Sequence, residues 1–140
     1  MSSIGTILVA YDESEVSHRA LERAATLARA LGSKLVVTSV APVVTSAAPR
    51  SIATDPVETA AEHRAELGQA RAYLDGEGLS AEYIEALGHE AEGIVAAARE
   101  RSADMIVIGG RELSAIQRLL GQSVSDAVSH GAGCDVLIVH

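Results

Sequence analysis

Residues 7–12 read ILVAYD, a continuous apolar run that stops at an acidic residue. Three more apolar runs without polar alternation occur at 35–37, 105–108 and 136–139. Runs of this kind are typical of strands that are buried on both faces, as in parallel sheets. A weaker run at 81–86 contains two glutamates, which predicts an edge strand.

Helical patterns separate these strands. Alanine and leucine recur at helical spacing up to Leu31, and Gly32 is suited to end that helix. Ser14 is placed to cap its start. Residues 55–58, DPVE, have the order of an N-cap, a first-turn proline and an acidic residue, which predicts a second helix reaching about Gly76–Gly78. Two further helices are predicted at 91–101 and 124–129.

The alternation of strands and helices predicts one open, doubly wound α/β domain spanning residues 1–140, with five parallel strands and helices on both faces. The hydrophobic share of 48% is enough for a sizeable core. Residues 41–54, rich in Ala, Pro, Ser and Thr, are predicted to form a mobile loop.

Composition argues against several function classes. Eleven Lys+Arg against 19 Asp+Glu give a net charge of −8, and the chain has no Trp or Phe, so neither a basic surface nor stacking platforms for nucleic acid are expected. The apolar runs are too short to span a membrane, and the start of the chain lacks the pattern of a signal peptide, which predicts a cytoplasmic protein. A single cysteine, Cys134, excludes an internal disulfide.

The last apolar run has no helix after it to cover its edge. Because an uncovered apolar edge strand invites pairing, we expect a homodimer through Val136, Leu137, Ile138 and Val139. The alternative is that this strand lies inside the sheet.

Ligands of open α/β sheets bind beyond the carboxyl ends of the strands, where the strand order reverses. Asp12 follows the first strand, Val40 the second and Gly109 the fourth. The glycine turn leads on to serines at the start of a helix, a suitable arrangement for a phosphate.

At these residues the chain resembles the universal stress protein family, in its small single-domain form. The resemblance rests on ILVAYDESEVSHRAL at 7–21, GHEAEGI at 88–94 and the whole segment 103–140. It implies a sheet of order 3-2-1-4-5 and dimerisation through the last strand. In nucleotide-binding members an aspartate contacts the ribose, a valine backbone meets the adenine, and a motif of glycine, two residues, glycine, nine residues, glycine and a serine or threonine holds the phosphates.

Carried onto this chain, the resemblance makes four positions candidate contacts to ATP or another adenine nucleotide: Asp12, Val40, Gly109 and Ser123. Neighbouring candidates are Arg111, Val124 and Ser125. Two positions depart from the motif, because Glu112 and Gln122 stand where it has glycine. Gly121 lies one place early, so a shifted loop is the alternative alignment.

Glu112 places a negative charge where the motif needs a small neutral residue. At about 5 Å from one phosphate charge, with an effective dielectric near 20, the repulsion is roughly 3 kcal/mol. That corresponds to a loss in affinity on the order of a hundredfold. A bound Mg²⁺ or Mn²⁺ that bridges Glu112 to phosphate reverses the sign of this effect.

Other site types fit less well. Asp12, Ser14, Ser17 and His18 have the residue types of a Ser-His-Asp triad but not its spacing, so Ser14 is interpreted as a helix cap and His18 as an exposed helix residue. No G-K-[ST] motif is present for a P-loop. A phosphate-receiving domain needs an aspartate after the third strand, where Leu87 and Gly88 stand. A flavin carrier needs aromatic stacking residues, which this chain largely lacks.

The sequence therefore predicts a stress-associated, non-catalytic regulatory or binding protein, acting on a protein partner of unknown identity, with an altered or vestigial adenine-nucleotide site. The alternative is an ATP-binding switch with slow hydrolysis.

Overall fold

The computed structural model describes residues 4–39, 56–85, 90–110 and 124–140. In these segments strands and helices alternate in the order β1 (Thr6–Tyr11), α1 (Glu15–Leu31), β2 (Lys34–Ser39), α2 (Pro56–Gly76), β3 (Ala81–Ile84), α3 (Glu90–Glu100), β4 (Met105–Gly109), α5 (Val124–Gly131) and β5 (Asp135–Val139). The predicted loop at 41–54 lies outside the described residues.

The sheet has five parallel strands in the order β3-β2-β1-β4-β5. The predicted fold class and strand order are thus confirmed. β1 is the central strand and pairs with β2 on one side and β4 on the other. β3 and β5 are the edges, so the alternative in which the last strand lies inside the sheet is wrong.

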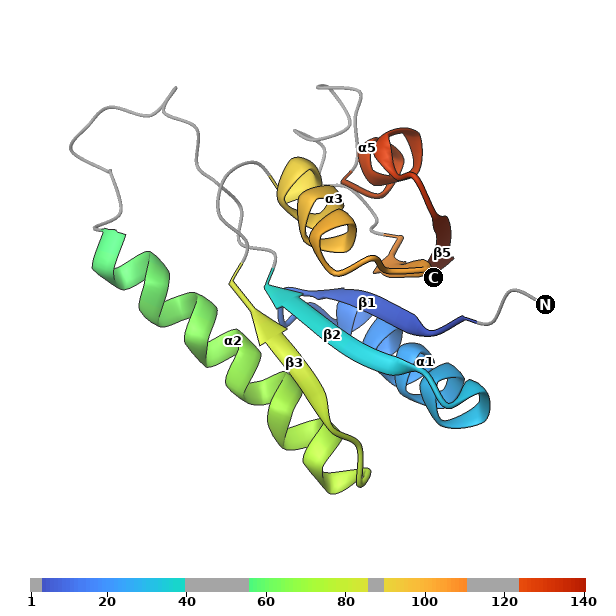
Figure 1. Cartoon of the computed structure of the whole chain (residues 1–140). Coiled ribbons are helices and arrows are strands. Elements are labelled where there is room, and N and C mark those ends of the chain that lie inside the picture. Colours follow the sequence, from blue (N-terminus) through green and yellow to red (C-terminus); the bar gives the residue numbers. More distant parts are fainter. Residues whose placement is uncertain (1–3, 40–55, 86–89, 111–123) are drawn as a thin grey trace.

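Helices cover both faces of the sheet, as Figure 1 shows. The side chains of β1 alternate between two core clusters, one on each face of the sheet. Ile7 and Val9 pack in one cluster with α1 and α2, whereas Leu8 and Ala10 pack in the other with α3 and α5. Each of these four side chains is at most 2% exposed, which explains why the strand reads as a continuous apolar run.

The ends of the elements follow local signals in the sequence. Ser14 caps α1, and its side chain accepts a hydrogen bond from the Ser17 N–H. Gly32 ends α1 in the left-handed conformation, with φ of 67°. β3 is shorter than predicted, because Glu85 already lies outside it. Of the helices that the structure describes, none combines the length and the apolar character needed to cross a membrane.

Candidate functional site

The strand order reverses at β1, because β2 and β3 lie on one side of it and β4 and β5 on the other. Parallel pairing brings the carboxyl ends of β1, β2 and β4 to one edge of the sheet, which is visible in Figure 1. Asp12 follows β1, Ser39 ends β2 opposite Tyr11, and Gly109 ends β4. The structure therefore brings Asp12 and Gly109 to adjacent strand ends, at the place where ligands bind in open α/β sheets.

The turn after β1 is held by a short network of hydrogen bonds. Asp12 Oδ1 accepts the Ser14 N–H at 2.9 Å, and the Asp12 N–H donates to Ser17 Oγ at 3.2 Å. Ser17 Oγ donates in turn to the Ser14 carbonyl at 3.0 Å. Glu13, between them, has φ of 67°, an uncommon conformation for a residue with a side chain. The Asp12 carboxylate is thus oriented by the backbone of the turn.

Ser17 supports this turn, a structural role that was not predicted from the sequence. The feature of the sequence that could have indicated this role is its spacing of three residues from the helix cap Ser14. Ser17 is 6% exposed, and its hydroxyl hydrogen is directed to a carbonyl oxygen, which is the role of a structural serine. The same contact argues against a nucleophilic serine paired with a base.

Gly109 is buried where the first turn of α1 crosses the end of β4. A Cβ on this residue would lie 3.0 Å from the carbonyl carbon, the carbonyl oxygen and Cγ1 of Val16. The next residue, Gly110, donates its N–H to the Val139 carbonyl at 2.7 Å. A Cβ on Gly110 would lie 2.8 Å from Cγ2 of Ile138. Gly109 is therefore needed for close packing against backbone atoms as well as being a candidate for ligand contact, whereas the atoms close to Gly110 belong to side chains.

The electrostatic environment at the end of β1 is acidic. Burial raises the pKa of the Tyr11 hydroxyl, and the carboxylates of Glu13, Asp12 and Glu66 raise it further. Tyr11 is 3% exposed, and its hydroxyl group donates to Gln69 Oε1 on α2 at 3.4 Å. These three carboxylates therefore act on the Tyr11 hydroxyl group, which lies toward Gln69 on α2.

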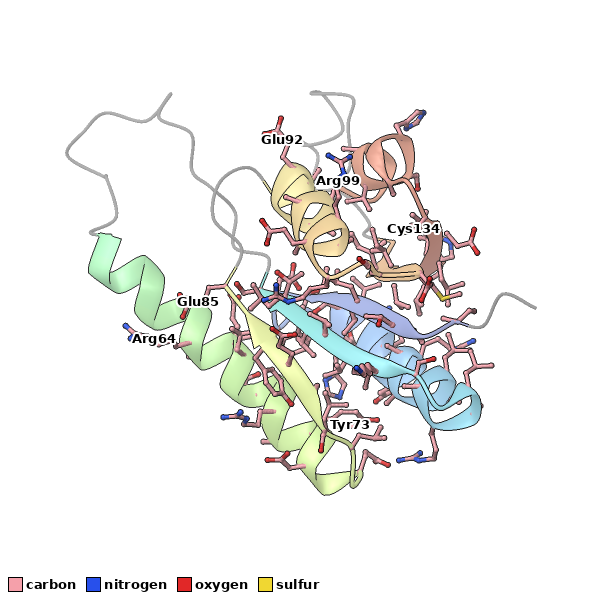
Figure 2. The ribbon with its side chains drawn as sticks, in the orientation of Figure 1. Arg64, Tyr73, Glu85, Glu92, Arg99 and Cys134 are labelled. Carbon is pink, nitrogen blue, oxygen red and sulfur yellow. The ribbon has the colours of Figure 1, made fainter. Side chains whose placement is uncertain are left out.

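His18 is partly exposed, with 41% of its side chain accessible, and it makes contacts that the sequence did not predict. Its ring meets the Tyr11 ring edge-on at 6.3 Å and the Tyr73 ring edge-on at 5.1 Å between centroids. Its Nε2 lies 3.4 Å from Glu22 Oε1, one helical turn along α1. Tyr73, labelled in Figure 2, comes from α2. His18 therefore helps to join α1 and α2 beside the site.

The predicted contacts Val40, Arg111 and Ser123 lie outside the described residues, and so do the two motif departures, Glu112 and Gln122. Val124 and Ser125 form the start of α5, where the sequence placed a helix N-terminus. Among the side chains that the structure describes, no group of three His, Cys, Asp or Glu could hold a metal ion.

Comparisons with known proteins agree with this architecture. The model of the universal stress protein family matches residues 3–140. The universal stress protein YxiE of Bacillus subtilis (strain 168) is 34% identical over 143 residues, which cover 95% of this chain and 97% of that protein.

Solved structures are similar over the full length of the chain. A universal stress protein in complex with cAMP is 29% identical with a TM-score of 0.76, covering 99% of this chain and 98% of that one. A universal stress protein from Archaeoglobus fulgidus in complex with dAMP is 25% identical with a TM-score of 0.70, covering 100% of both chains. Both relatives were thus solved with an adenine nucleotide that carries a single phosphate.

Proposed function

Since this chain belongs to the universal stress protein family, we propose that it is a non-catalytic binding protein whose altered nucleotide site prefers an adenine nucleoside monophosphate to ATP. The observation that carries the proposal is the position of Asp12 and Gly109 at adjacent strand ends, where the strand order reverses. Relatives with the same fold were solved with cAMP and with dAMP, which supports an adenine nucleotide as the ligand.

Asp12 is proposed to accept a hydrogen bond from a ribose hydroxyl. Its Oδ1 already accepts the Ser14 N–H, so the carboxylate is oriented before a ligand arrives. The backbone at Gly109 is proposed to approach the phosphate. Val40, Ser123 and Ser125 remain proposed contacts, to the adenine in the case of Val40 and to the phosphate in the case of the serines.

One feature of the sequence favours one phosphate over three. Glu112 replaces a motif glycine with a bulky, negatively charged residue. Because repulsion grows with the number of ligand charges, this residue penalises a triphosphate more than a monophosphate.

We expect the purified protein to bind AMP or cAMP at least tenfold more tightly than ATP in titration calorimetry without divalent cations. Asp12→Ala is expected to lose at least tenfold in AMP affinity, because a hydrogen bond to a charged group contributes about 1.5–3 kcal/mol. Glu15→Ala is the matched control, since the Glu15 side chain is 93% exposed on the first turn of α1. Circular dichroism checks that the variants are folded.

The alternative function is an ATP-binding switch with slow hydrolysis. It predicts that the protein, once purified and denatured, releases a stoichiometric amount of ATP, or that it converts added ATP to ADP. Either result would contradict a non-catalytic protein with an altered site. In the proposed function, nucleotide occupancy alters a surface that a protein partner in the cytoplasm recognises.

We also propose that the protein is a homodimer through β5. Among the described strands, β5 pairs with β4 alone, so its other backbone edge is unpaired within the chain. After the exposed Asp135 its side chains are apolar, with Val136, Leu137 and Ile138 half-buried and Val139 8% exposed. An edge of this kind is stabilised when a second copy covers it.

Sedimentation of the intact protein at tens of micromolar is expected to give twice the chain mass of 14.5 kDa, with dissociation on dilution. Charged substitutions in β5 are poor probes, because Leu137 packs on one core cluster and Ile138 on the other. A purely monomeric species at these concentrations would contradict the proposed dimer.

A further inference from the structure

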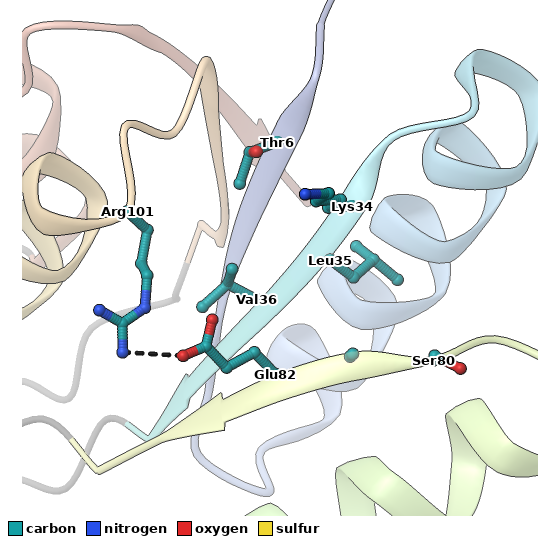
Figure 3. A pocket seen from close by; sticks show the side chains of 8 residues that line it. Thr6, Lys34, Leu35, Val36, Ser80, Glu82 and Arg101 are labelled. Atoms are coloured by element: carbon teal, nitrogen blue, oxygen red, sulfur yellow. Dashed lines mark ion pairs between the residues drawn. The ribbon is translucent and has the colours of Figure 1, made fainter.

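A groove of about 410 Å³ lies at the opposite end of the sheet from Asp12 and Gly109. It is formed at the amino ends of β1, β2 and β3, and its lining residues are Thr6, Lys34, Leu35, Val36, Ser80, Ala81, Glu82 and Arg101. Figure 3 shows these side chains around the hollow. Its volume is within the range of small-molecule sites.

Strand register explains why Thr6, Lys34, Val36 and Glu82 share one face, whereas Leu35 and Ala81 face the other side of the sheet. Thr6 pairs with Lys34, and Val36 pairs with Glu82. Val36 packs in the core cluster of α3 and α5, so this row of side chains is on the face that those helices cover. α2 covers β2 and β3 on the other face. The groove is the part of the α3 side where the sheet extends beyond the helix.

The two cations of the groove differ in their partners. Arg101 Nη2 lies 2.8 Å from Glu82 Oε1, so its charge is compensated at the wall of the groove. Lys34, the only lysine in the chain, has no ion pair among the described residues, and its side chain is exposed. Near Thr6, the carboxylate of Asp104 accepts the N–H groups of Gly5 and Thr6 at 2.8 and 3.0 Å.

Among the lining residues of the groove, Lys34 therefore contributes one positive charge that forms no ion pair, in a protein of net charge −8. Val36 lies beneath the groove and is only 3% exposed, so the apolar contacts come from the aliphatic stems of Lys34 and Arg101 in its walls. The hydroxyl groups of Thr6 and Ser80 add polar contacts beside the ammonium group. This combination suits a ligand with one anionic end and an apolar body.

We propose that this groove binds a small amphipathic carboxylate, of the class of medium-chain fatty acids, with its carboxylate on the Lys34 ammonium group and its chain against the aliphatic stems of Lys34 and Arg101. The site is separate from the nucleotide site, because it lies at the other end of the strands. The inference thus stands whether or not the proposed nucleotide function is correct.

The test uses octanoate as the probe and amide chemical shifts of the labelled intact protein as the readout. A ligand of about ten heavy atoms is expected to bind with a dissociation constant of roughly 0.1–10 mM. Saturable shifts are expected at Thr6, Lys34, Ser80 and Glu82. Octanol, which has the same chain without the charge, is expected to bind at least tenfold more weakly.

Variants distinguish binding of octanoate in this groove from nonspecific attraction of the anion to exposed cations. Lys34→Gln is expected to weaken octanoate binding at least tenfold, and Lys34→Arg to retain it. Arg64→Gln is the matched control, because Arg64 is an exposed cation on the outer side of α2, as Figure 2 shows, and it has no ion pair in the described part of the chain. Equal binding of octanol and octanoate, unchanged binding by Lys34→Gln, or shifts confined to other parts of the protein would each overturn the proposal.

Discussion

Replacing Gly109 with alanine is expected to lower the free energy of unfolding by about 1–3 kcal/mol. The added Cβ would lie 3.0 Å from the carbonyl carbon and the carbonyl oxygen of Val16. These are backbone atoms in the first turn of α1, which the Ser14 cap fixes, so they cannot move aside as a flexible side chain would. Urea denaturation without nucleotide measures the effect, because the ligand contributes nothing to stability under that condition.

Gly68→Ala is the matched control and is expected to act in the opposite direction. Gly68 is exposed within α2, and a Cβ there would have nothing within 4 Å. Alanine in an exposed helix interior is favoured over glycine by about 1 kcal/mol, so this variant is expected to gain stability. If Gly109→Ala proves as stable as the unchanged protein, close packing does not explain the glycine, and ligand contact remains its only proposed role.

The fold could be predicted from the sequence because its signals are local. The run ILVAY at 7–11 is continuously apolar because both faces of the strand are buried. This burial could therefore be predicted from the sequence alone. Gly32 and Ser14 mark the two ends of α1 through backbone chemistry that each residue type favours. The strand order came from the family resemblance, and the pairing confirms it.

The surroundings of the site depend on contacts between distant segments, which the sequence alone does not reveal. His18 has the spacing of an outward-facing helix residue, but Tyr73 of α2 packs against its ring. From the sequence, Gly109 was interpreted as a phosphate contact. Its close approach to Val16 results from the packing of α1 on β4, which the sequence does not reveal. The groove at Lys34 arises from strand register, and Arg101 reaches Glu82 from the end of another helix.

The second large effect is expected at the motif positions that lack glycine. Replacing Glu112 and Gln122 with glycine together is expected to raise ATP affinity on the order of a hundredfold. The reason is the loss of a negative charge, which at about 5 Å from one phosphate charge contributes roughly 3 kcal/mol of repulsion. AMP affinity is expected to rise less, because AMP carries fewer charges, so the preference for a monophosphate should shrink. Titration calorimetry with both nucleotides measures this change.

The effects of charge and of side-chain size on ATP affinity can be measured separately at Glu112. Glu112→Gln removes the charge and keeps the bulk, so it is expected to recover most of the gain in ATP affinity if repulsion dominates. Glu112→Gly is expected to give a larger gain in ATP affinity than Glu112→Gln only if the smaller residue also lets the phosphate come closer to the backbone. Glu92→Gln, an exposed carboxylate on α3 labelled in Figure 2, removes the same charge elsewhere and is expected to change ATP affinity less than twofold, because exposed charges are screened by salt.

Divalent cations provide the decisive comparison. If Glu112 repels the phosphates, added Mg²⁺ is expected to narrow the difference in ATP affinity between the unchanged protein and the glycine variant, because a cation bridging the carboxylate to phosphate turns repulsion into attraction. The glycine variant lacks that carboxylate, so it should gain less from the cation. Equal ATP affinities for the unchanged protein, Glu112→Gln and Glu112→Gly without cation would refute the repulsion. The proposed preference for a monophosphate would then lose its physical basis.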